Sequence, residues 1–192
     1  RLATAQVLPF PFPAYRPGQQ ALARNIYIAL RDARHLVCEA PTGLGKTAAA
    51  LYAAARALGE GRVQRAFYLT ARGTGRLAAE AALDLMRQSG LKARSVTLDA
   101  KEKVCVMGNP VCDPDICPRA KGYFDRKRQG VADSFAIDRF DRETIARLCE
   151  THTLCPFEFS LHLAETAEFI ICDYNYVFDP RARLQRFFQT RT

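Results

Sequence analysis

The chain has 192 residues, 48% of them hydrophobic and 25% charged, which is the composition of a globular domain with a buried core. No apolar run reaches the ~20 residues that cross a bilayer, and no signal peptide heads the sequence, so we expect a cytoplasmic protein without a membrane partner. The formal net charge of +8 is compatible with a polyanionic partner, and equally with a basic surface that serves only solubility. The seven cysteines, an odd number, favour metal ligation over a disulfide framework in a reducing compartment.

Strands and helices alternate in the first part of the chain. The predicted order is a helix from Pro17 to about Arg34, a strand at 35–40, a helix at 47–58, a strand at 65–71, a helix at 75–89 and a strand at 95–100. The alanine-rich run TAAALYAAARAL has an especially strong helical preference. This alternation predicts an α/β fold in which helices cover a parallel sheet.

The pattern changes from Lys101 to about Leu154. Strand signal is weak there, loop residues come first (GNPVCDPDICP), and helical residues follow (RETIARLCETH). A buried strand is predicted at 168–178, and PRARLQRFFQ has the composition of a helix start. We interpret the middle part as an insertion, and divide the chain into residues 1–100, the insertion 101–160, and a return to the first domain at 161–192.

The stretch APTGLGKT, residues 40–47, fits a phosphate-binding loop between a strand and a helix, with Ala40 where glycine is usual. Such a loop directs backbone N–H groups and a helix N-terminus at phosphate oxygens. We expect Lys46 to reach the β and γ phosphates of ATP and Thr47 to bind Mg²⁺, and we assign both as catalytic. The other predicted nucleotide-binding residues of the loop are Pro41, Thr42, Gly43, Leu44 and Gly45.

Hydrolysis of ATP by a motor also needs a pair of carboxylates at the end of another strand. Asp173 follows the apolar FIIC and is a candidate for the metal, but Tyr174 occupies the position of the second carboxylate. We therefore expect the pair to lie beyond Thr192. Because the sequence starts at Arg1, we interpret it as a fragment.

Cys105, Cys112 and Cys117 follow the spacing C-x6-C-x4-C, which differs from the paired C-x2-C of structural zinc sites. Cys155 is the best candidate for a fourth ligand, because the dipeptide Cys-Pro also occurs at Cys117 and is common beside iron–sulfur ligands. The spacing by itself leaves zinc open.

The remaining cysteines have structural interpretations. Cys38 and Cys172 lie in apolar predicted strands, where a free cysteine packs as a small hydrophobe. Cys149 and His152 make a second candidate ligand set with Cys155, C-x2-H-x2-C. They also continue a helical stripe with Ile145 and Leu148, and we favour this buried stripe.

Five motifs in one order resemble the iron–sulfur superfamily 2 DNA helicases of the Rad3/XPD/DinG type, and the bacterial Rad3-related branch is the most similar. The motifs are YRPGQQ, EAPTGLGKT, YLTARGTGR, the cysteine set with CPFEFS, and CDYNYVFDP, so the resemblance covers nearly the whole chain. It implies a RecA-like P-loop motor domain with helices on both faces of the sheet. A small, mostly helical domain around a [4Fe-4S] cluster would interrupt this domain, with Cys105, Cys112, Cys117 and Cys155 as ligands.

The resemblance also implies nucleotide and DNA contacts. Gln19, with Arg16, resembles an adenine-sensing motif, although a plain helix-start glutamine would look the same. The stretch RAKGYFDRKRQG combines cations with rings, as single-stranded DNA sites do, although a solvated helix face with two core aromatics is the alternative. The residues expected at DNA are Thr70, Arg72 and Thr74 at a strand end, where ordinary polarity is the alternative, and Arg119, Lys121, Tyr123 and Arg126 in the basic stretch.

The function that follows is an ATP-dependent DNA helicase that moves 5′ to 3′ on single strands, in DNA repair or replication restart. Single-stranded DNA and duplex junctions are its expected partners, it is expected to be a monomer, and the fragment is expected to bind nucleotide without unwinding DNA. One alternative is a zinc-dependent nucleic-acid-binding module whose P-loop is idle or regulatory. Another is a P-loop kinase or small-molecule NTPase, against which CDYNYVFDP and the basic stretch count.

Overall fold

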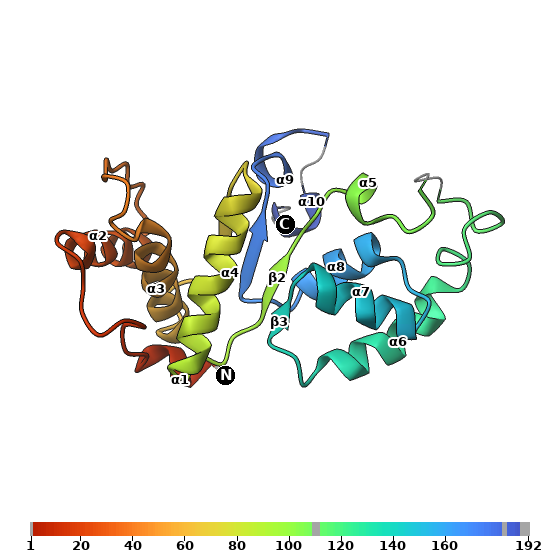
Figure 1. Cartoon of the computed structure of the whole chain (residues 1–192), viewed down its shortest axis with the longest axis horizontal. Helices are drawn as coiled ribbons and strands as arrows, with labels where there is room; N and C mark the ends of the chain where they lie inside the picture. The colour runs from red at the N-terminus through yellow and green to blue at the C-terminus, as the bar shows by residue number, and fades with distance from the viewer. Residues whose placement is uncertain (1, 109–111, 182–183, 189–192) are drawn as a thin grey trace. The chain divides into compact units, whose positions relative to one another are not determined.

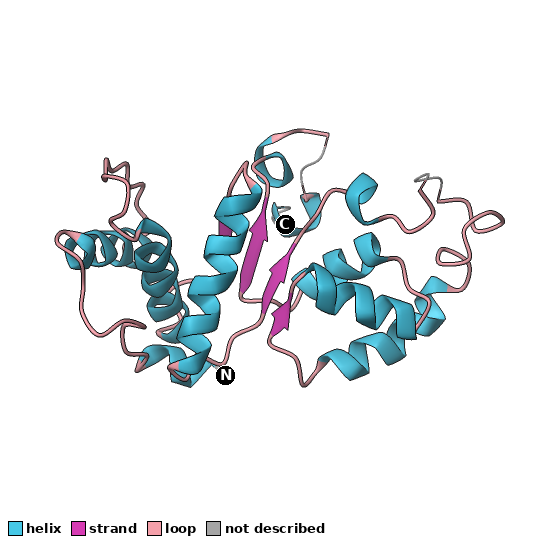
Figure 2. Cartoon of the chain, viewed as in Figure 1, coloured by secondary structure: helices cyan, strands magenta, loops and turns pink. Residues whose placement is uncertain are grey.

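The computed structural model describes residues 2–108, 112–181 and 184–188 and contains alternating helices and strands (Figures 1 and 2). The helices are α1 (Leu2–Gln6), α2 (Gln19–Arg31), α3 (Lys46–Gly59), α4 (Gly73–Gln88), α5 (Lys101–Val104), α6 (Tyr123–Ser134), α7 (Arg142–Thr151), α8 (Pro156–Ala164), α9 (Asn175–Phe178) and α10 (Gln185–Phe188). The strands are β1 (Ala66–Leu69), β2 (Ser95–Thr97), β3 (Arg139–Phe140) and β4 (Phe169–Cys172). The chain forms two compact units, residues 1–68 with 72–93 and residues 69–71 with 94–192.

The four strands form one sheet in the order β1-β4-β2-β3. The central strand β2 runs parallel to both β3 and β4, with Ser95 beside Arg139 on one side and Phe169 on the other. Neighbouring strands that run parallel must be joined by crossover connections, and here these connections contain the helices. The predicted α/β fold with a parallel sheet is therefore confirmed.

The first unit is built around the alanine-rich helix α3, which packs against α1, α2 and α4. Its small side chains are buried on several sides, as Ala49, Ala55 and Ala57 are inaccessible to solvent. Alanine combines the highest helix propensity with a short side chain, so the neighbouring helices can approach closely. The three helices predicted for this part of the chain correspond to α2, α3 and α4 and are confirmed.

The strand predicted at residues 35–40 is wrong, because the backbone there is neither helix nor strand. Val37 is 97% exposed and Leu36 41%, and Cys38 is also exposed, so the interpretation of Cys38 as a packed side chain is wrong as well. A strand needs a neighbour that takes its backbone hydrogen bonds, whatever its apolar content. Within the described residues no strand pairs with this segment.

The second unit has its core at β2 and β4, where all four residues of β4 are inaccessible to solvent. Cys172 is therefore buried, as predicted. The strand predicted at 168–178 is too long, since β4 ends at Cys172 and α9 begins at Asn175. The carboxylate of Asp173 accepts the N–H of Asn175 at 3.0 Å, and this local bond favours a turn over a continued strand. The two-residue β3 was not predicted, because two residues are too few to show a periodic pattern.

Helix α7 coincides with the predicted helical segment RETIARLCETH, and its buried stripe is confirmed at Ile145, Leu148 and Cys149, whereas His152 caps the helix and is only partly buried. Cys149 is inaccessible to solvent, and Ile145 and Leu148 are buried. His152 follows the helix, and its Nε2 lies 2.8 Å from Oδ2 of Asp133 on α6. Helix α6 approaches this region closely at Gly130, where a Cβ would lie 2.7 Å from Cδ1 of Leu154.

Two further expectations concern the chain as a whole. In the ranges that the structure describes, no helix combines the length and the apolar character that crossing a membrane requires. The division into residues 1–100, 101–160 and 161–192 stays a prediction. The residues from 101 to 160 that are described contain α5, α6, α7, most of α8 and the short β3.

Candidate nucleotide site and cysteine segment

The phosphate loop leads directly into α3, which begins at Lys46. Gly43 and Gly45 adopt φ values of +83° and +84°, in the left-handed region that glycine enters without a steric penalty. Gly45 is the N-terminal cap of α3 and has no side chain that could take the first N–H groups of the helix. A helix start of this kind offers N–H groups and the positive end of the helix dipole to an anion.

Gln19 and Arg16, predicted to sense the nucleotide base, both contact this loop. Gln19 is only 3% exposed; its Oε1 accepts the backbone N–H of Arg16 at 3.0 Å, and its Nε2 donates to the carbonyl oxygen of Gly45 at 3.1 Å. The guanidinium of Arg16 donates to the carbonyl oxygen of Gly43. The structure thus brings both residues to the loop, and their contact with adenine stays a prediction.

The two residues assigned as catalytic lie at the start of α3. The ammonium of Lys46 donates to the carbonyl oxygens of Ala40 at 3.0 Å and Pro41 at 2.9 Å. The hydroxyl of Thr47 lies 2.9 Å from that of Tyr68, which belongs to β1. Lysine and hydroxyl groups placed so close to one loop can serve a phosphate and its cation.

A cavity of about 470 Å³ opens beside this loop. Its lining includes Thr42, Gly43, Gly45, Lys46 and Thr47 from the predicted set, together with Arg16 and Phe12. Sequence reasoning missed Phe12 and Tyr68, since neither belongs to the loop pattern. The signal that could have found Phe12 is its place in the aromatic lead before Gln19, because an exposed ring beside a phosphate site can stack on a base.

Asp173, the candidate carboxylate for the metal, follows β4 in the second unit and accepts the N–H of Asn175. The phosphate loop lies in the first unit. The metal role of Asp173 stays a prediction.

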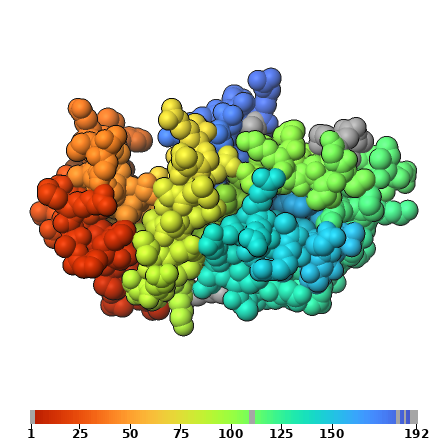
Figure 3. Space-filling model, in the orientation of Figure 1, coloured from red at the N-terminus to blue at the C-terminus, as the bar shows by residue number. Residues whose placement is uncertain are grey.

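The cysteines proposed as ligands occupy different local environments, and none of the seven cysteines, all of which are described, forms a disulfide bond. Cys105 follows α5 and is half-buried, Cys112 is exposed, and Cys117 is buried in the loop. Cys155 is the N-terminal cap of α8 and is half-buried. In Figure 3 the green part of the chain, which follows residue 100, forms part of the visible surface.

Electrostatic interactions connect two of these cysteines. A hydrogen bond with Cys112 raises the pKa of Lys101, and the nearby Cys155 and Glu158 act in the same direction. Burial raises the pKa of Cys155, although the backbone N–H groups of Glu158 and Phe157 bond to its sulfur and oppose the increase. Lys101 at the start of α5 therefore interacts with Cys112, and the thiols of Cys112 and Cys155 interact electrostatically with each other.

Cys149, the remaining candidate, has the properties of a core thiol. Burial raises its pKa to about 12, although the guanidinium of Arg119 acts in the opposite direction. A thiol with this pKa stays protonated near neutral pH, whereas a metal ligand must be a thiolate. This agrees with the interpretation of Cys149 as part of the buried stripe.

The residues proposed as ligands fit a metal centre by their chemistry but not by their grouping. The donor chemistry is suitable, since four thiols are present, Cys155 receives two N–H groups and Cys112 receives an ammonium. Among the residues that the structure describes, however, no three His, Cys, Asp or Glu side chains form a group that could hold a metal ion. The thiols thus fit a metal–thiolate centre in kind, and their assignment as ligands stays a prediction.

The residues expected at DNA fall into two groups. Arg119 donates to the carbonyl oxygens of Cys149 at 2.8 Å and Leu154 at 2.7 Å and also pairs with Glu150. Arg126 donates to the carbonyl oxygen of Thr153 at 3.0 Å, which belongs to the same connection after α7. Helix C-termini carry unsatisfied carbonyls and partial negative charge, so both guanidinium groups stabilise the end of α7.

The other expected DNA residues differ in exposure. Tyr123 is only 8% exposed, whereas Lys121, Arg72 and Thr74 are exposed. The backbone N–H of Thr70 donates to the carbonyl oxygen of Cys172 at 3.0 Å, which ties Thr70 to the end of β4. Contact of all these residues with DNA stays a prediction.

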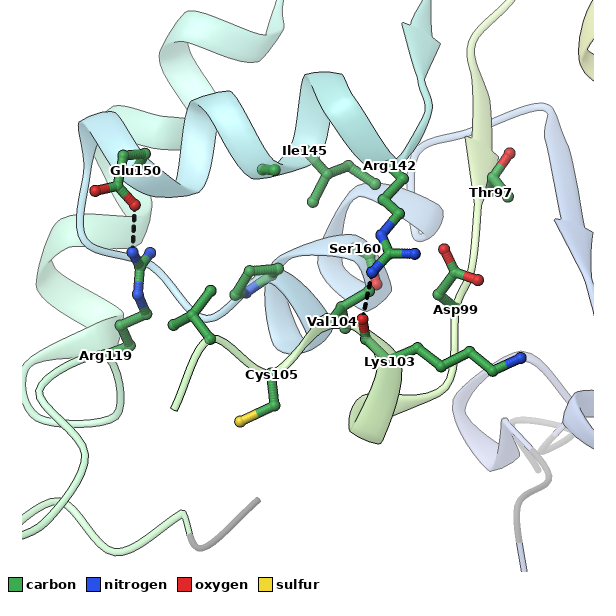
Figure 4. A pocket seen from close by; sticks show the side chains of 13 residues that line it. Thr97, Asp99, Lys103, Val104, Cys105, Arg119, Arg142, Ile145, Glu150 and Ser160 are labelled. Atoms are coloured by element: carbon green, nitrogen blue, oxygen red, sulfur yellow. Dashed lines mark hydrogen bonds and ion pairs between the residues drawn. The ribbon is translucent and has the colours of Figure 1, made fainter. Parts of the chain in front are cut away.

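A cavity of about 280 Å³ in the second unit was not predicted from the sequence (Figure 4). Asp99, Arg142 and Glu150 contribute charged groups to it, and Cys105 lies at its border with its side chain pointing away from Ile145. The signal that could have found it is the position of Asp99 just after β2, because the carboxyl ends of parallel strands are frequent sites in α/β folds.

The parallel sheet and its covering helices are those of a RecA-like helicase domain, which defines the class of the protein. Residues 83–190, more than half of the chain, match the family model DEAD_2, and the chain therefore belongs to the DEAD_2 family of helicase-type nucleic-acid motors. The phosphate loop precedes the matched residues. No curated protein matches the chain. The predicted helicase class is confirmed at this level.

Proposed function

We propose that this chain is the ATP-binding and cysteine-bearing portion of a DNA helicase that moves 5′ to 3′ on single strands and acts in DNA repair or replication restart. Membership of the DEAD_2 family supports the motor class. The observation that carries the proposal is the buried Gln19, which joins the backbone of Arg16 to that of Gly45 and so connects the YRPGQQ motif with the phosphate loop.

The ligand proposed for the loop is ATP with Mg²⁺. The N–H groups at the start of α3 and the ammonium of Lys46 suit its phosphates, and the hydroxyl of Thr47 suits the cation. Phe12, at the border of the same cavity, presents a ring to the base. Lys46 would exchange its bonds to two loop carbonyls for bonds to phosphate oxygens, which are stronger because both partners are charged.

The test is the affinity of Lys46→Ala for a fluorescent ATP analogue in the presence of Mg²⁺, together with ATP hydrolysis stimulated by single-stranded DNA. Losing a charge-assisted bond worth about 1.5–3 kcal/mol corresponds to about 10- to 150-fold weaker binding. Lys92→Ala is the matched control, because Lys92 is an exposed lysine of the same unit that lies outside the cavity lining. Equal affinity of Lys46→Ala and wild type would reject the ATP site.

The proposal for the cysteines is a [4Fe-4S] cluster held by Cys105, Cys112, Cys117 and Cys155. The donor chemistry of the four thiols and membership of the DEAD_2 family support this proposal. A bound cluster would supply folding free energy to a loop-rich segment that buries little apolar surface. Arg119 and Arg126 would keep the end of this segment beside the connection that leads to Cys155.

The corresponding experiment is anaerobic purification followed by iron, sulfide and zinc analysis. We expect about four irons and four sulfides per chain, and a loss of both in Cys112→Ser. Cys38→Ser is the matched control, since Cys38 is also exposed but belongs to the phosphate-loop unit. One tightly bound zinc without iron would reject the cluster and favour the zinc-dependent nucleic-acid-binding module. The result of the ATP test would not depend on this outcome.

A further inference from the structure

Helix α6, labelled in Figure 1, belongs to the second unit. Its two faces differ chemically. Tyr123, Gly130 and Ser134 are buried on one face. Arg126 donates from the same helix to the carbonyl oxygens of Pro118 and Thr153. Two of the helix residues expected at DNA, Tyr123 and Arg126, thus have internal contacts.

The other face exposes a large ring. Phe124 is 75% exposed, and the ammonium of Lys127, three residues further along the helix, lies 5.4 Å from the centre of its ring. The ring of Tyr123 meets that of Phe124 edge-on, with centroids 5.5 Å apart. One ring is therefore anchored in the interior while the next presents its π-system to solvent, with a cation held above it.

The charges around this ring are mainly positive. Lys121 and Arg128 are exposed, and they stand three residues before and four residues after Phe124 in the sequence. Residues i and i+4 lie on one side of a helix, so Arg128 shares the face of Phe124. Asp125 is the one acidic residue between Lys121 and Arg128. Three cations against one carboxylate make this surface more complementary to a polyanion than to a neutral or acidic protein.

We propose that Phe124, with Lys121, Lys127 and Arg128, forms a platform on which an unpaired base of a single-stranded nucleic acid stacks while the cations contact the adjoining phosphates. Base stacking on an aromatic side chain tolerates any sequence, and lysine or arginine beside the ring adds the phosphate contact. This inference rests on the proposed helicase function and moves its DNA contact from Arg119, Tyr123 and Arg126 to the outward face of α6.

The structure also offers a matched control. Phe135, directly after α6, is 62% exposed, and the guanidinium carbon of Arg94 lies 5.4 Å from its ring centre. Arg94 is buried, however, and its guanidinium also donates to the carbonyl oxygen of Phe135 at 3.2 Å. This second ring–cation pair is a structural contact. Removing the Phe135 ring tests whether loss of any exposed ring affects binding.

The experiment measures binding of a fluorescent oligothymidylate to the anaerobically purified protein by anisotropy. Stacking of one base is worth about 1–3 kcal/mol, so Phe124→Ala is expected to bind about 5- to 150-fold more weakly, whereas Phe124→Tyr and Phe135→Ala keep the wild-type affinity. Lys127→Ala is expected to reduce the slope of log K against log salt by about 0.7. Circular dichroism establishes that each variant is folded.

The outcomes separate this inference from the proposed function. Wild-type binding that Phe124→Ala leaves unchanged overturns the platform, while ATP binding that depends on Lys46 would still support the motor. Equal weakening by Phe124→Ala and Phe135→Ala also overturns it, because the effect would not be specific to α6. A wild-type protein that binds ATP but no oligothymidylate at low salt overturns the platform and the choice of single-stranded DNA together.

Discussion

The phosphate loop at 40–45 and the described residues of the cysteine segment, 105–108 and 112–122, are both irregular, but they are held in different ways. The backbone carbonyl oxygens of the loop accept hydrogen bonds from the side chains of Gln19, Arg16 and Lys46. In the described part of the cysteine segment, the side chain of Arg119 donates to the carbonyl oxygen of Cys149 near the end of α7, and the side chain of Lys101 bonds to that of Cys112. The comparison shows that a site made of backbone groups can be shaped by the chain alone, whereas a site made of thiols depends on what the thiols bind.

The largest effect is expected from a methyl group in the loop. In Gly45→Ala the Cβ would lie 2.2 Å from Nε2 of Gln19, and φ is +84°. Left-handed strain of about 1–2 kcal/mol adds to the loss of the buried glutamine's hydrogen bonds, so we expect about 3 kcal/mol lower unfolding free energy in urea. Gly43→Ala is the matched variant, because its φ is +83° but a Cβ there would meet no atom within 4 Å.

The two glycine variants sharpen the comparison by separating strain from contact. We expect Gly43→Ala to lose only about 1–2 kcal/mol. Equal losses in both variants would mean that Gln19 does not shape the loop.

A smaller effect is expected at the end of the cysteine segment. Arg119→Ala removes the donor to Cys149 and Leu154 and should lower the unfolding free energy by about 2 kcal/mol, with partial recovery in Arg119→Lys. Arg147→Ala, an exposed arginine on α7, serves as the control. If Arg119→Ala is as stable as Arg147→Ala but binds DNA more weakly, the guanidinium serves DNA and not the end of α7.

The smallest effect concerns the start of α7, where Oδ1 of Asp141 accepts the N–H of Thr144 at 2.9 Å. Asp141→Ala should cost about 1 kcal/mol. Burial alone would raise the pKa of Asp141, but the N–H and hydroxyl of Thr144 and the charge of Arg139 outweigh it, so the pKa lies below its ordinary 3.8. The contribution of the carboxylate is therefore complete above that ordinary value and is lost as the pH falls further.

The measurement for Asp141 is urea unfolding of wild type and Asp141→Asn from about pH 6 down to about pH 3. Asparagine keeps an oxygen for the cap but does not titrate. The advantage of the wild type should therefore shrink as the pH falls. An advantage that stays constant over this range would show that the charge of Asp141 contributes nothing to the cap.

Much of the fold was predictable because its signals are local. The alanine-rich run that became α3 and the apolar FIIC that became β4 carry their preferences within a few residues. The glycines at 43 and 45 likewise indicated a tight loop before a helix. The strand expected at 35–40 failed because its composition cannot supply a neighbouring strand.

The candidate sites were predictable to different depths. Residue types identified the loop and the cysteines, since phosphate needs glycine, lysine and hydroxyl groups and a metal–thiolate centre needs thiols. The order of basic and aromatic residues could not tell which ones face solvent. Tyr123 and Phe124 are adjacent and similar, yet one is 8% exposed and the other 75%.

The sequence by itself therefore determined the class of the fold, the place of the phosphate loop and the set of thiols, because each follows from short-range preference or from the chemistry of a side chain. Only the tertiary structure decided that Gln19 contacts the loop, that Arg119 and Arg126 stabilise the end of α7, and that Phe124 remains outside. The contacts of Gln19, Arg119 and Arg126 join residues that are distant in the chain, and the exposure of Phe124 depends on the same packing. Local sequence patterns do not encode this packing.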